Sequence, residues 1–211
     1  AWTIRNFLLS DFYNELTKSF NVYLCSSLES EDLKDMNIKA HKIYKCIPYK
    51  KNWLHMRFSV RRENYHYAIA GSETYDLKLK HRLLSNSYLR NFFIKLELKF
   101  IKYVFGSSIL NILDKIEKYF MLRLKEAEYY QTIFDDIKPD IVFSTFSVLK
   151  NEFLPLYVAK NMGVKTVVNI TSWDNISSKG RLAYNLDCYL AWSKNMKHEI
   201  LNFHETLLEK N

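Results

Sequence analysis

The chain has 211 residues, enough for one ordinary domain or for one domain with an insertion. Hydrophobic residues make up 48% of it and charged residues 26%, which excludes a disordered protein and predicts a globular one. The formal net charge is +8, and residues 50–102 hold twelve basic and four acidic side chains, an excess that equals the whole net charge. Such a local charge attracts anions, so phospholipid, nucleic acid and phosphorylated substrates are candidate partners.

No apolar stretch reaches 18 residues, so the sequence predicts no membrane-spanning helix, and no signal peptide is visible. Three cysteines, Cys25, Cys46 and Cys188, lie in apolar runs without the CxxC or Cys/His spacing of a metal site. We therefore expect buried thiols in a reducing cytosol. The histidines show no metal-ligand spacing either, so we expect no metal.

The first region, residues 1–49, predicts helix, strand, turn and strand. Residues 4–20 carry apolar side chains at helical spacing, and residues 21–27 form a short apolar run typical of a buried strand. A helical turn is predicted within residues 29–38. A second strand is predicted over residues 42–49, where Pro48 stops it.

The second region, residues 50–137, contains no convincing strand. Residues 87–105 and 107–137 are helical by period and propensity, and Ser107 or Ser108 is the expected cap of the second helix. The apolar stripe of that helix is expected to pack on another element. Its members are Ile109, Ile112, Leu113, Ile116, Phe120, Leu124 and Ala127.

The third region, residues 138–211, alternates apolar strands with helices. Strands are predicted over residues 138–146, 164–172 and 187–193, and helices over residues 151–163 and 194–204. This alternation favours a parallel sheet covered on both faces.

Ligands of such sheets bind at the carboxyl ends of the strands. Three segments should therefore share one rim: Ser144–Ser147, Ser172–Gly180 and Trp192–Lys194. The middle segment belongs to "TSWDNISSKG", residues 171–180, which combines an aromatic ring, a carboxylate, an amide, hydroxyls and a cation. This composition predicts a binding loop.

Several of these motifs resemble one protein family. "SWDNISSKG" followed by "DCYLAWSKNMKHEILNFH", with weaker support from "IRNFLLSDFYNEL" and "KPDIVFSTF", resembles the N-terminal half of GT-B glycosyltransferases of bacterial surface-polysaccharide synthesis. CDP-glycerol glycerophosphotransferases and UDP-GlcNAc 2-epimerase-like proteins are related. The resemblance covers roughly residues 4–27 and 138–204, and nothing in residues 50–137. It implies a Rossmann-like α/β domain made of residues 1–49 and 138–211, with residues 50–137 as a long helical insertion.

The sequence departs from the family at both ends. The resemblance implies a strand before Arg5, where only "AWT" stands, and a nucleotide-binding half after His204. That half would bind the nucleotide-sugar donor, and this chain has no GxGxxG or P-loop of its own. We therefore expect no cofactor on this chain, which would be a fragment, one subunit of a split transferase or a degenerate member.

The resemblance implies an acceptor-binding role for the 171–180 loop. Asp174 is the candidate catalytic base or acceptor-orienting group, and Trp173 would stack on a sugar face. Alternatively, Asp174 caps a turn and Trp173 belongs to the core.

Phosphate or hydroxyl groups are the expected partners of the rest of the loop. Asn175 and Ser178 would donate hydrogen bonds, and Lys179 would meet phosphate charge if a helix begins at Gly180. Asn175 is equally consistent with a bond that stabilises a turn.

Two further pairs are candidates for substrate binding. Ser144 and Thr145 would line the same cleft or merely end a strand. Arg5 and Asn6 would face phosphate or only cap the first helix. His204 and Glu152 are expected to be structural.

The basic, aromatic helices of residues 50–137 predict an anionic membrane surface as partner, at the inner face of the plasma membrane of a cytoplasmic protein. The alternatives are a solvated helix face, an oligomerisation surface or nucleic acid, for which no known binding motif is present. A non-catalytic module that binds membrane or a partner protein is the alternative function. The expected surface cations are Lys50, Lys51, Arg57, Arg61, Arg62, Arg90, Lys95, Lys99 and Lys102.

Overall fold

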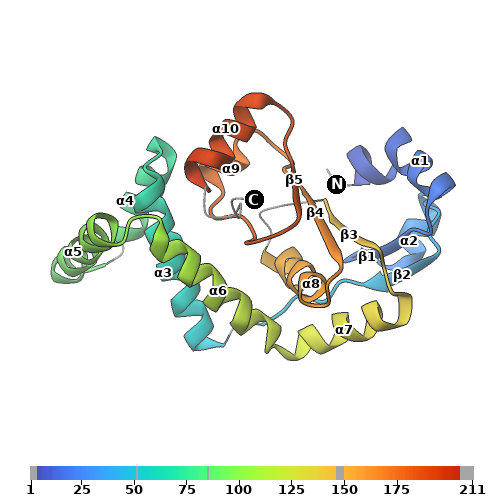
Figure 1. Ribbon diagram of the computed structural model, residues 1–211, viewed down its shortest axis with the longest axis horizontal. Helices are drawn as coiled ribbons and strands as arrows, with labels where there is room; N and C mark the ends of the chain where they lie inside the picture. Colours follow the sequence, from blue (N-terminus) through green and yellow to red (C-terminus); the bar gives the residue numbers. More distant parts are fainter. Residues whose placement is uncertain (1–3, 51, 85, 146–149, 205–211) are drawn as a thin grey trace. The chain divides into compact units, whose positions relative to one another are not determined.

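The structure is a computed structural model that describes residues 4–50, 52–84, 86–145 and 150–204. Its fold is mixed α/β, with long helices and two small parallel sheets (Figure 1). The chain divides into two compact units, Ala1–Tyr49 and Lys50–Asn211. The proposed joining of residues 1–49 with residues 138–211 in one domain stays a prediction.

The first unit pairs two parallel strands around a crossover helix. Tyr23 of β1 lies opposite Lys42 of β2, and Ser26 lies opposite Lys45. The predicted order of helix, strand, turn and strand is confirmed. Its elements are η1 (Ile4–Leu8), α1 (Asp11–Ser19), β1 (Tyr23–Ser26), α2 (Ser30–Asp35) and β2 (Lys42–Lys45).

A small apolar core holds this unit together. Tyr13, Leu33 and Ile38 are buried, and the Tyr13 hydroxyl donates to the Lys39 carbonyl at 2.5 Å. The single helix predicted over residues 4–20 was wrong, because the chain breaks between η1 and α1. At the break the Ser10 hydroxyl donates to the Phe7 carbonyl at 2.7 Å, a local bond that competes with helix continuation.

The second unit begins with five helices. The first starts at Asn52, whose side chain accepts from the His55 amide at 2.8 Å, and it ends at Gly71 in the left-handed region. The five are α3 (Trp53–Ala70), α4 (Glu73–Leu84), α5 (Tyr88–Val104), α6 (Ser108–Leu122) and α7 (Lys125–Ile137).

A three-stranded parallel sheet with its covering helices completes the second unit. The three strands predicted for this region are confirmed, in the order β3-β4-β5. Side chains of α8 are buried almost all round, as expected of a helix that covers a parallel sheet. The elements are β3 (Ile141–Ser144), α8 (Lys150–Asn161), β4 (Lys165–Asn169), α9 (Asn175–Ser178), β5 (Cys188–Leu190) and α10 (Lys194–Phe203).

A buried carboxylate lies between two buried guanidinium groups. Arg62 of α3 donates from Nε to Oδ1 of Asp114 at 2.7 Å. Arg181 donates from Nε and Nη2 to Oδ2 of Asp114 at 2.9 and 2.5 Å. All three side chains are less than 2% exposed. The cluster therefore joins α3, α6 and the chain directly after the 171–180 loop.

The predicted packing face of residues 107–137 is only partly buried: Phe120 packs on His55 and Phe58 and Ala127 is buried, whereas Ile112 and Ile116 are exposed. The helix breaks at Arg123, and the buried positions of α6 are Leu110, Asp114, Glu117 and Met121 rather than the predicted apolar stripe. Ile112 of that stripe is 54% exposed. The reason is electrostatic: α6 turns its acidic face inward because the buried Arg62, Arg181 and His55 lie there. Ser107 is the N-terminal cap residue, but its side chain makes no capping hydrogen bond.

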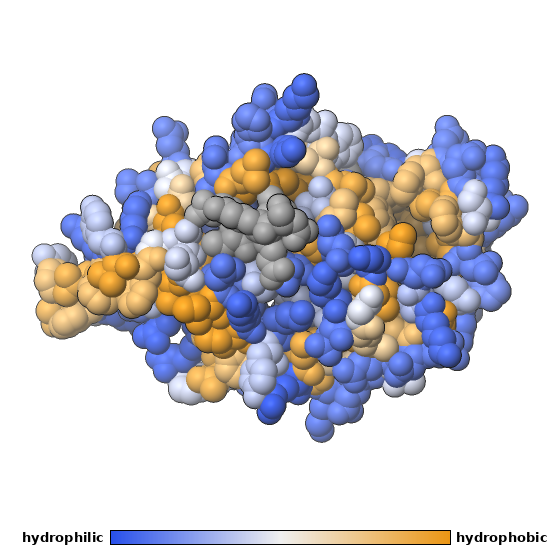
Figure 2. Space-filling view, viewed as in Figure 1, coloured by the Kyte–Doolittle hydropathy of each residue, from blue (hydrophilic) through white to orange (hydrophobic). Residues whose placement is uncertain are grey.

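Helix α5 exposes most of its large apolar side chains to solvent. Figure 2 shows hydrophobic residues gathered over this helix. The side chains that are at least 55% exposed are Tyr88, Leu89, Phe92, Phe93, Leu96, Phe100, Tyr103 and Val104.

The exposure of the cysteines tests the prediction of buried thiols. Cys25 is exposed and Cys46 and Cys188 are half-buried, so the expectation of buried thiols was wrong.

In the part of the chain that the structure describes, no helix combines the length and the apolar composition needed to cross a bilayer.

The central ion cluster predicts a stability effect. Asp114→Ala should lower the free energy of unfolding by about 3–5 kcal/mol, because it leaves two buried guanidinium groups without their carboxylate. Asp135→Ala, which removes an exposed carboxylate from α7, should change it by less than about 0.5 kcal/mol. Urea denaturation of both variants measures the difference. Equal stabilities would contradict the role of the cluster.

The contacts of Asp187, directly before β5, predict that the stability of the protein depends on pH. Asp187 accepts from the Lys160 ammonium at 2.6 Å and from the amide and hydroxyl of Thr166 at 2.9 and 2.8 Å. Desolvation alone would raise the pKa of Asp187, but these donors outweigh it and lower the pKa to about 2.

A lowered pKa adds stability above the unfolded value of about 3.9 and loses it as the pH falls towards 2. Between pH 4 and pH 2 the parent chain should therefore lose on the order of 1–2 kcal/mol more stability than Asp187→Asn. Denaturant titrations at pH 5, 4, 3 and 2 give both slopes. Parallel slopes would contradict the prediction.

Candidate site at the carboxyl ends of the strands

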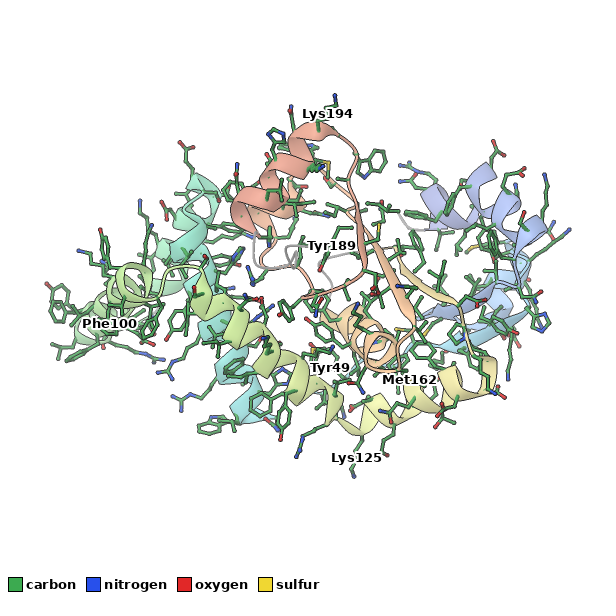
Figure 3. All side chains as sticks on the ribbon, in the orientation of Figure 1. Tyr49, Phe100, Lys125, Met162, Tyr189 and Lys194 are labelled. Atoms are coloured by element: carbon green, nitrogen blue, oxygen red, sulfur yellow. The ribbon has the colours of Figure 1, made fainter. Side chains whose placement is uncertain are left out.

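The carboxyl ends of β3, β4 and β5 meet at one rim, as predicted for the ligand crevice. The Thr171 hydroxyl donates to the Thr145 carbonyl at 3.2 Å and joins the ends of β4 and β3. The Trp192 indole donates to the Ile170 carbonyl at 2.5 Å and joins the ends of β5 and β4. Figure 3 labels Lys194 at the start of α10, directly after this rim.

Asp174 is held by its own loop. Its Oδ1 accepts from the Ser172 hydroxyl at 2.6 Å, and its Oδ2 accepts from the Ser178 hydroxyl at 3.1 Å. The Lys179 ammonium lies 3.8 Å from Oδ2. The side chain is 34% exposed, so the carboxylate is fixed in orientation and still open to a ligand.

These contacts also set the charge state of Asp174. The Ser172 hydrogen bond is the largest cause that lowers its pKa, and Ser178 and Lys179 act in the same direction against desolvation. A carboxylate with a lowered pKa is ionised at neutral pH but accepts protons poorly. The lowered pKa therefore argues against Asp174 as a general base.

The neighbours of Asp174 divide into one exposed and one buried side chain. Trp173 is 75% exposed, so the alternative that placed it in the core was wrong. Asn175 is 2% exposed, and its Nδ2 has no hydrogen-bond partner among the described residues. Trp173 is thus accessible at the surface of the loop, and Asn175 lies beneath that surface.

Helix α4 holds the loop in place. The last carbonyls of a helix lack partners within the helix. Here the carbonyls of α9 accept hydrogen bonds from Ser72, directly before α4, and from two side chains of α4: Ser72 to Ser177 at 3.0 Å, Tyr75 to Ile176 at 2.6 Å, and Lys78 to Ser178. The helical segment before the sheet therefore orders the candidate site.

The C-terminal side of the loop differs from the prediction. No helix begins at Gly180; instead α9 begins at Asn175 and ends at Ser178. The expected cradle of helix amides for phosphate behind Lys179 was therefore wrong. Gly180 has a φ of +105°, a conformation that favours glycine, and Arg181 follows it into the buried ion cluster.

The other candidate binding residues lie in two places. Ser144 is buried at the end of β3, where its hydroxyl bonds the Glu152 carboxylate, and Thr145 contributes its carbonyl to the rim. Arg5 and Asn6 lie in η1 of the first unit, where the Arg5 Nε donates to the Asn6 side chain at 3.3 Å. Their part in binding stays a prediction.

Most of the expected surface cations are exposed. Arg62 is the exception: it is 1% exposed and bonded to Asp114, so its assignment to a membrane surface was wrong. Lys51 and the rim residue Ser147 lie outside the described residues. The exposed members are Lys50, Arg57, Arg61, Arg90, Lys95, Lys99 and Lys102.

A buried polar layer lies under the loop. His204, buried as expected of a structural residue, lies with Nε2 2.9 Å from the Ile176 carbonyl and with its ring 4.7 Å from that of His66. Burial lowers the pKa of His66 and lowers that of His204 to about 3, so both rings are neutral near pH 7. A pocket of about 290 Å³ nearby has Arg181 and Lys102 in its wall.

Metal ligands do not cluster in the described part of the chain, where no group of three or more His, Cys, Asp or Glu side chains has the geometry to hold an ion. A scan against protein-family models, a search of curated proteins and a search of solved structures each found no match for this chain.

Sequence reasoning missed the α4 residues that support the loop. Ser72, directly before α4, and Tyr75 and Lys78 within it recur every three residues, which places them on one side of the start of the helix. That spacing was visible in the sequence, but nothing local indicated that this side faces a loop about 100 residues away.

The hydrogen bond from Tyr75 of α4 to the Ile176 carbonyl predicts that its loss loosens the loop. Burial raises the pKa of Tyr75, so its hydroxyl stays protonated and donates. Tyr75→Phe should lower the free energy of unfolding by about 1 kcal/mol and speed amide hydrogen exchange in residues 175–180. Tyr88→Phe, at an 85% exposed position, serves as the matched control and should change neither. Unchanged exchange in the Tyr75 variant would contradict the support.

Proposed function

We propose that this chain is the acceptor-binding half of a glycosyltransferase that moves a sugar, or a polyol phosphate, from a nucleotide-activated donor to a surface-glycan or lipid-linked acceptor. One observation carries the proposal: the exposed Trp173 ring lies in sequence beside a preordered Asp174 carboxylate at the carboxyl ends of a parallel sheet. Ligands of α/β proteins bind at this edge.

The chemistry of the two side chains supports a carbohydrate ligand. An exposed indole offers a flat apolar face for the C–H face of a sugar, and a fixed carboxylate accepts hydrogen bonds from its hydroxyl groups. In this proposal Asp174 orients the acceptor hydroxyl, with Ser172 and Ser178 holding the carboxylate in place. Lys179 places a cation 3.8 Å from it, where an acceptor phosphate would be attracted.

The proposal also concerns the fold of this chain and the place where the donor would bind. The sheets β1-β2 and β3-β4-β5 would belong to one Rossmann-like half of a GT-B enzyme, with α3 to α7 as an insertion. The nucleotide-sugar donor would bind to a second half or to a partner subunit, so this chain would bind no cofactor itself. The complete enzyme would act in the cytoplasm, at the inner face of the plasma membrane.

The resemblance of "SWDNISSKG" and "DCYLAWSKNMKHEILNFH" to surface-polysaccharide glycosyltransferases adds support from the sequence. The competing proposal is a non-catalytic module that binds membrane or a partner protein through its helices. The exposed apolar side chains of α5 are compatible with either function.

An acceptor-binding experiment separates the two. The chain is titrated with a panel of bacterial capsule, teichoic-acid and lipid-linked oligosaccharides, and the dissociation constants are measured by calorimetry. Trp173→Ala and Asp174→Asn should each weaken binding of the recognised glycan at least tenfold, about 1.4 kcal/mol. Trp173→Ala should leave the unfolding free energy within about 0.5 kcal/mol, because the ring is exposed.

Trp53→Ala is the matched control, because it removes another exposed indole, 63% exposed, from α3. It should bind the glycan as the parent chain does. Equal affinity in the Trp173 variant, or no binding to any glycan of the panel, would contradict the acceptor role. A large loss of stability in both loop variants would make the loop structural.

A further inference from the structure

Helix α5 has an apolar face that is more than half exposed to solvent. We define the α5 apolar face as Leu89, Phe92, Phe93, Leu96, Phe100 and Tyr103, which are 55–83% exposed. Their spacing of three and four residues places them along one side of the helix. Phe100 is labelled on α5 in Figure 3. Monomeric proteins rarely leave a continuous apolar surface of this kind without a partner.

The opposite side of α5 packs against the rest of the second unit. Leu98 is 6% exposed, and the Asn91 amide donates to the Leu83 carbonyl at 2.9 Å. Ile94 and Ile101 are half-buried on the same side. This narrow strip attaches α5 to α3 and α4, so the apolar face is not the side by which the helix folds onto its own protein.

Cations follow the edge of the α5 apolar face. Lys95 and Lys99 lie one helical turn apart and are exposed, and neither forms an ion pair with any residue that the structure describes. The only acid of the helix, Glu97, bonds the Tyr65 hydroxyl and lies 3.7 Å from Arg61. The face is therefore amphipathic in the manner of interfacial helices: apolar in the middle and positive at its border.

A groove between α4 and α5 continues this surface. Its volume is about 400 Å³, and its walls include Leu79, Leu83, Phe92 and Leu96. Lys80, Lys95 and Lys99 line it as well, against one acid, Asp76. An apolar groove with cations beside it suits a ligand with a hydrocarbon chain and an anionic head.

We propose that the α5 apolar face and the α4–α5 groove bind the anionic phospholipids of a bilayer surface. The aromatic and leucine side chains lie at the boundary between headgroups and acyl chains, where amphipathic helices bind. Lys80, Lys95 and Lys99 meet the lipid phosphates, and the groove takes part of one acyl chain. This inference goes beyond the proposed function and needs neither donor nor glycan.

Charge complementarity distinguishes this occupant from two others. A second copy of the chain on a twofold axis would set the same lysines against each other without acids to match them. A nucleic-acid strand would neutralise the lysines but leave the leucines of the face in water. An anionic amphiphile satisfies both parts of the surface.

Vesicle sedimentation tests the proposal. The full chain is mixed with vesicles of phosphatidylcholine alone or with phosphatidylglycerol, at low and at high salt. It should bind the phosphatidylglycerol vesicles and be released partly by salt. Lys95→Gln with Lys99→Gln should weaken binding about twenty-fivefold, about fivefold for each cation. Phe93→Ser with Phe100→Ser should weaken it at least tenfold at an unchanged unfolding temperature, because both rings are exposed.

Two matched controls complete the experiment. Lys194→Gln with Lys197→Gln removes the same charge from exposed positions of α10, and Ile112→Ser removes an exposed apolar side chain from α6. Both should bind like the parent chain. Three results would overturn the proposal: equal binding to neutral vesicles, full binding by the phenylalanine variant, or no vesicle binding together with a dimer that this variant dissociates.

Discussion

The carboxylate of Asp114 is the interaction on which the arrangement of the second unit depends. Two guanidinium groups from segments more than 100 residues apart, Arg62 and Arg181, bind its two oxygens inside the protein. Removing such charges from water costs several kcal/mol for each ion, and only close, multiple hydrogen bonds offset that cost. The cluster is therefore satisfied in few geometries. It specifies how α3, α6 and the chain after the 171–180 loop must meet.

The position of the loop follows from this constraint. Gly180 makes the turn that Arg181 requires to enter the cluster, and the carbonyls of α9 then lie within reach of donors from α4. A helix of four residues has little stability of its own, since its nucleation is unfavourable. Side chains that bind its last carbonyls replace the missing turns. Asp174 can hold a fixed orientation because the backbone around it is fixed first, which is the preorganisation that a binding site needs.

The sequence predicted the strands well and the buried faces of the helices poorly. The strands β3, β4 and β5 are short apolar runs between turn signals, and for a parallel sheet that local pattern is sufficient. The rim at their carboxyl ends, with Trp173 and Asp174, followed from the topology alone. The prediction of the buried face of α6 failed because apolar periodicity assumes an apolar interior. Two of the inward positions of α6, Asp114 and Glu117, are acids. Their partners are distant in the chain, and no local pattern announces them.

Ionic contacts inside the protein also account for part of the excess of basic residues. The excess of basic residues in residues 50–102 looked like one positive surface, but part of it faces inward: Arg62 binds Asp114, Arg82 binds Glu63 at 2.6 Å, and Lys78 bonds a carbonyl of α9. The remaining cations are fewer and lie mainly on α3 and α5. Helix α5 packs inward through Leu98 and turns aromatic rings outward, with Lys95 and Lys99 at the border of the exposed face. Such a helix is suited to a partner whose surface is anionic and whose interior is hydrocarbon. The helical segment that holds the loop through α4 thus also carries, on α5, the apolar face that we propose binds phospholipid.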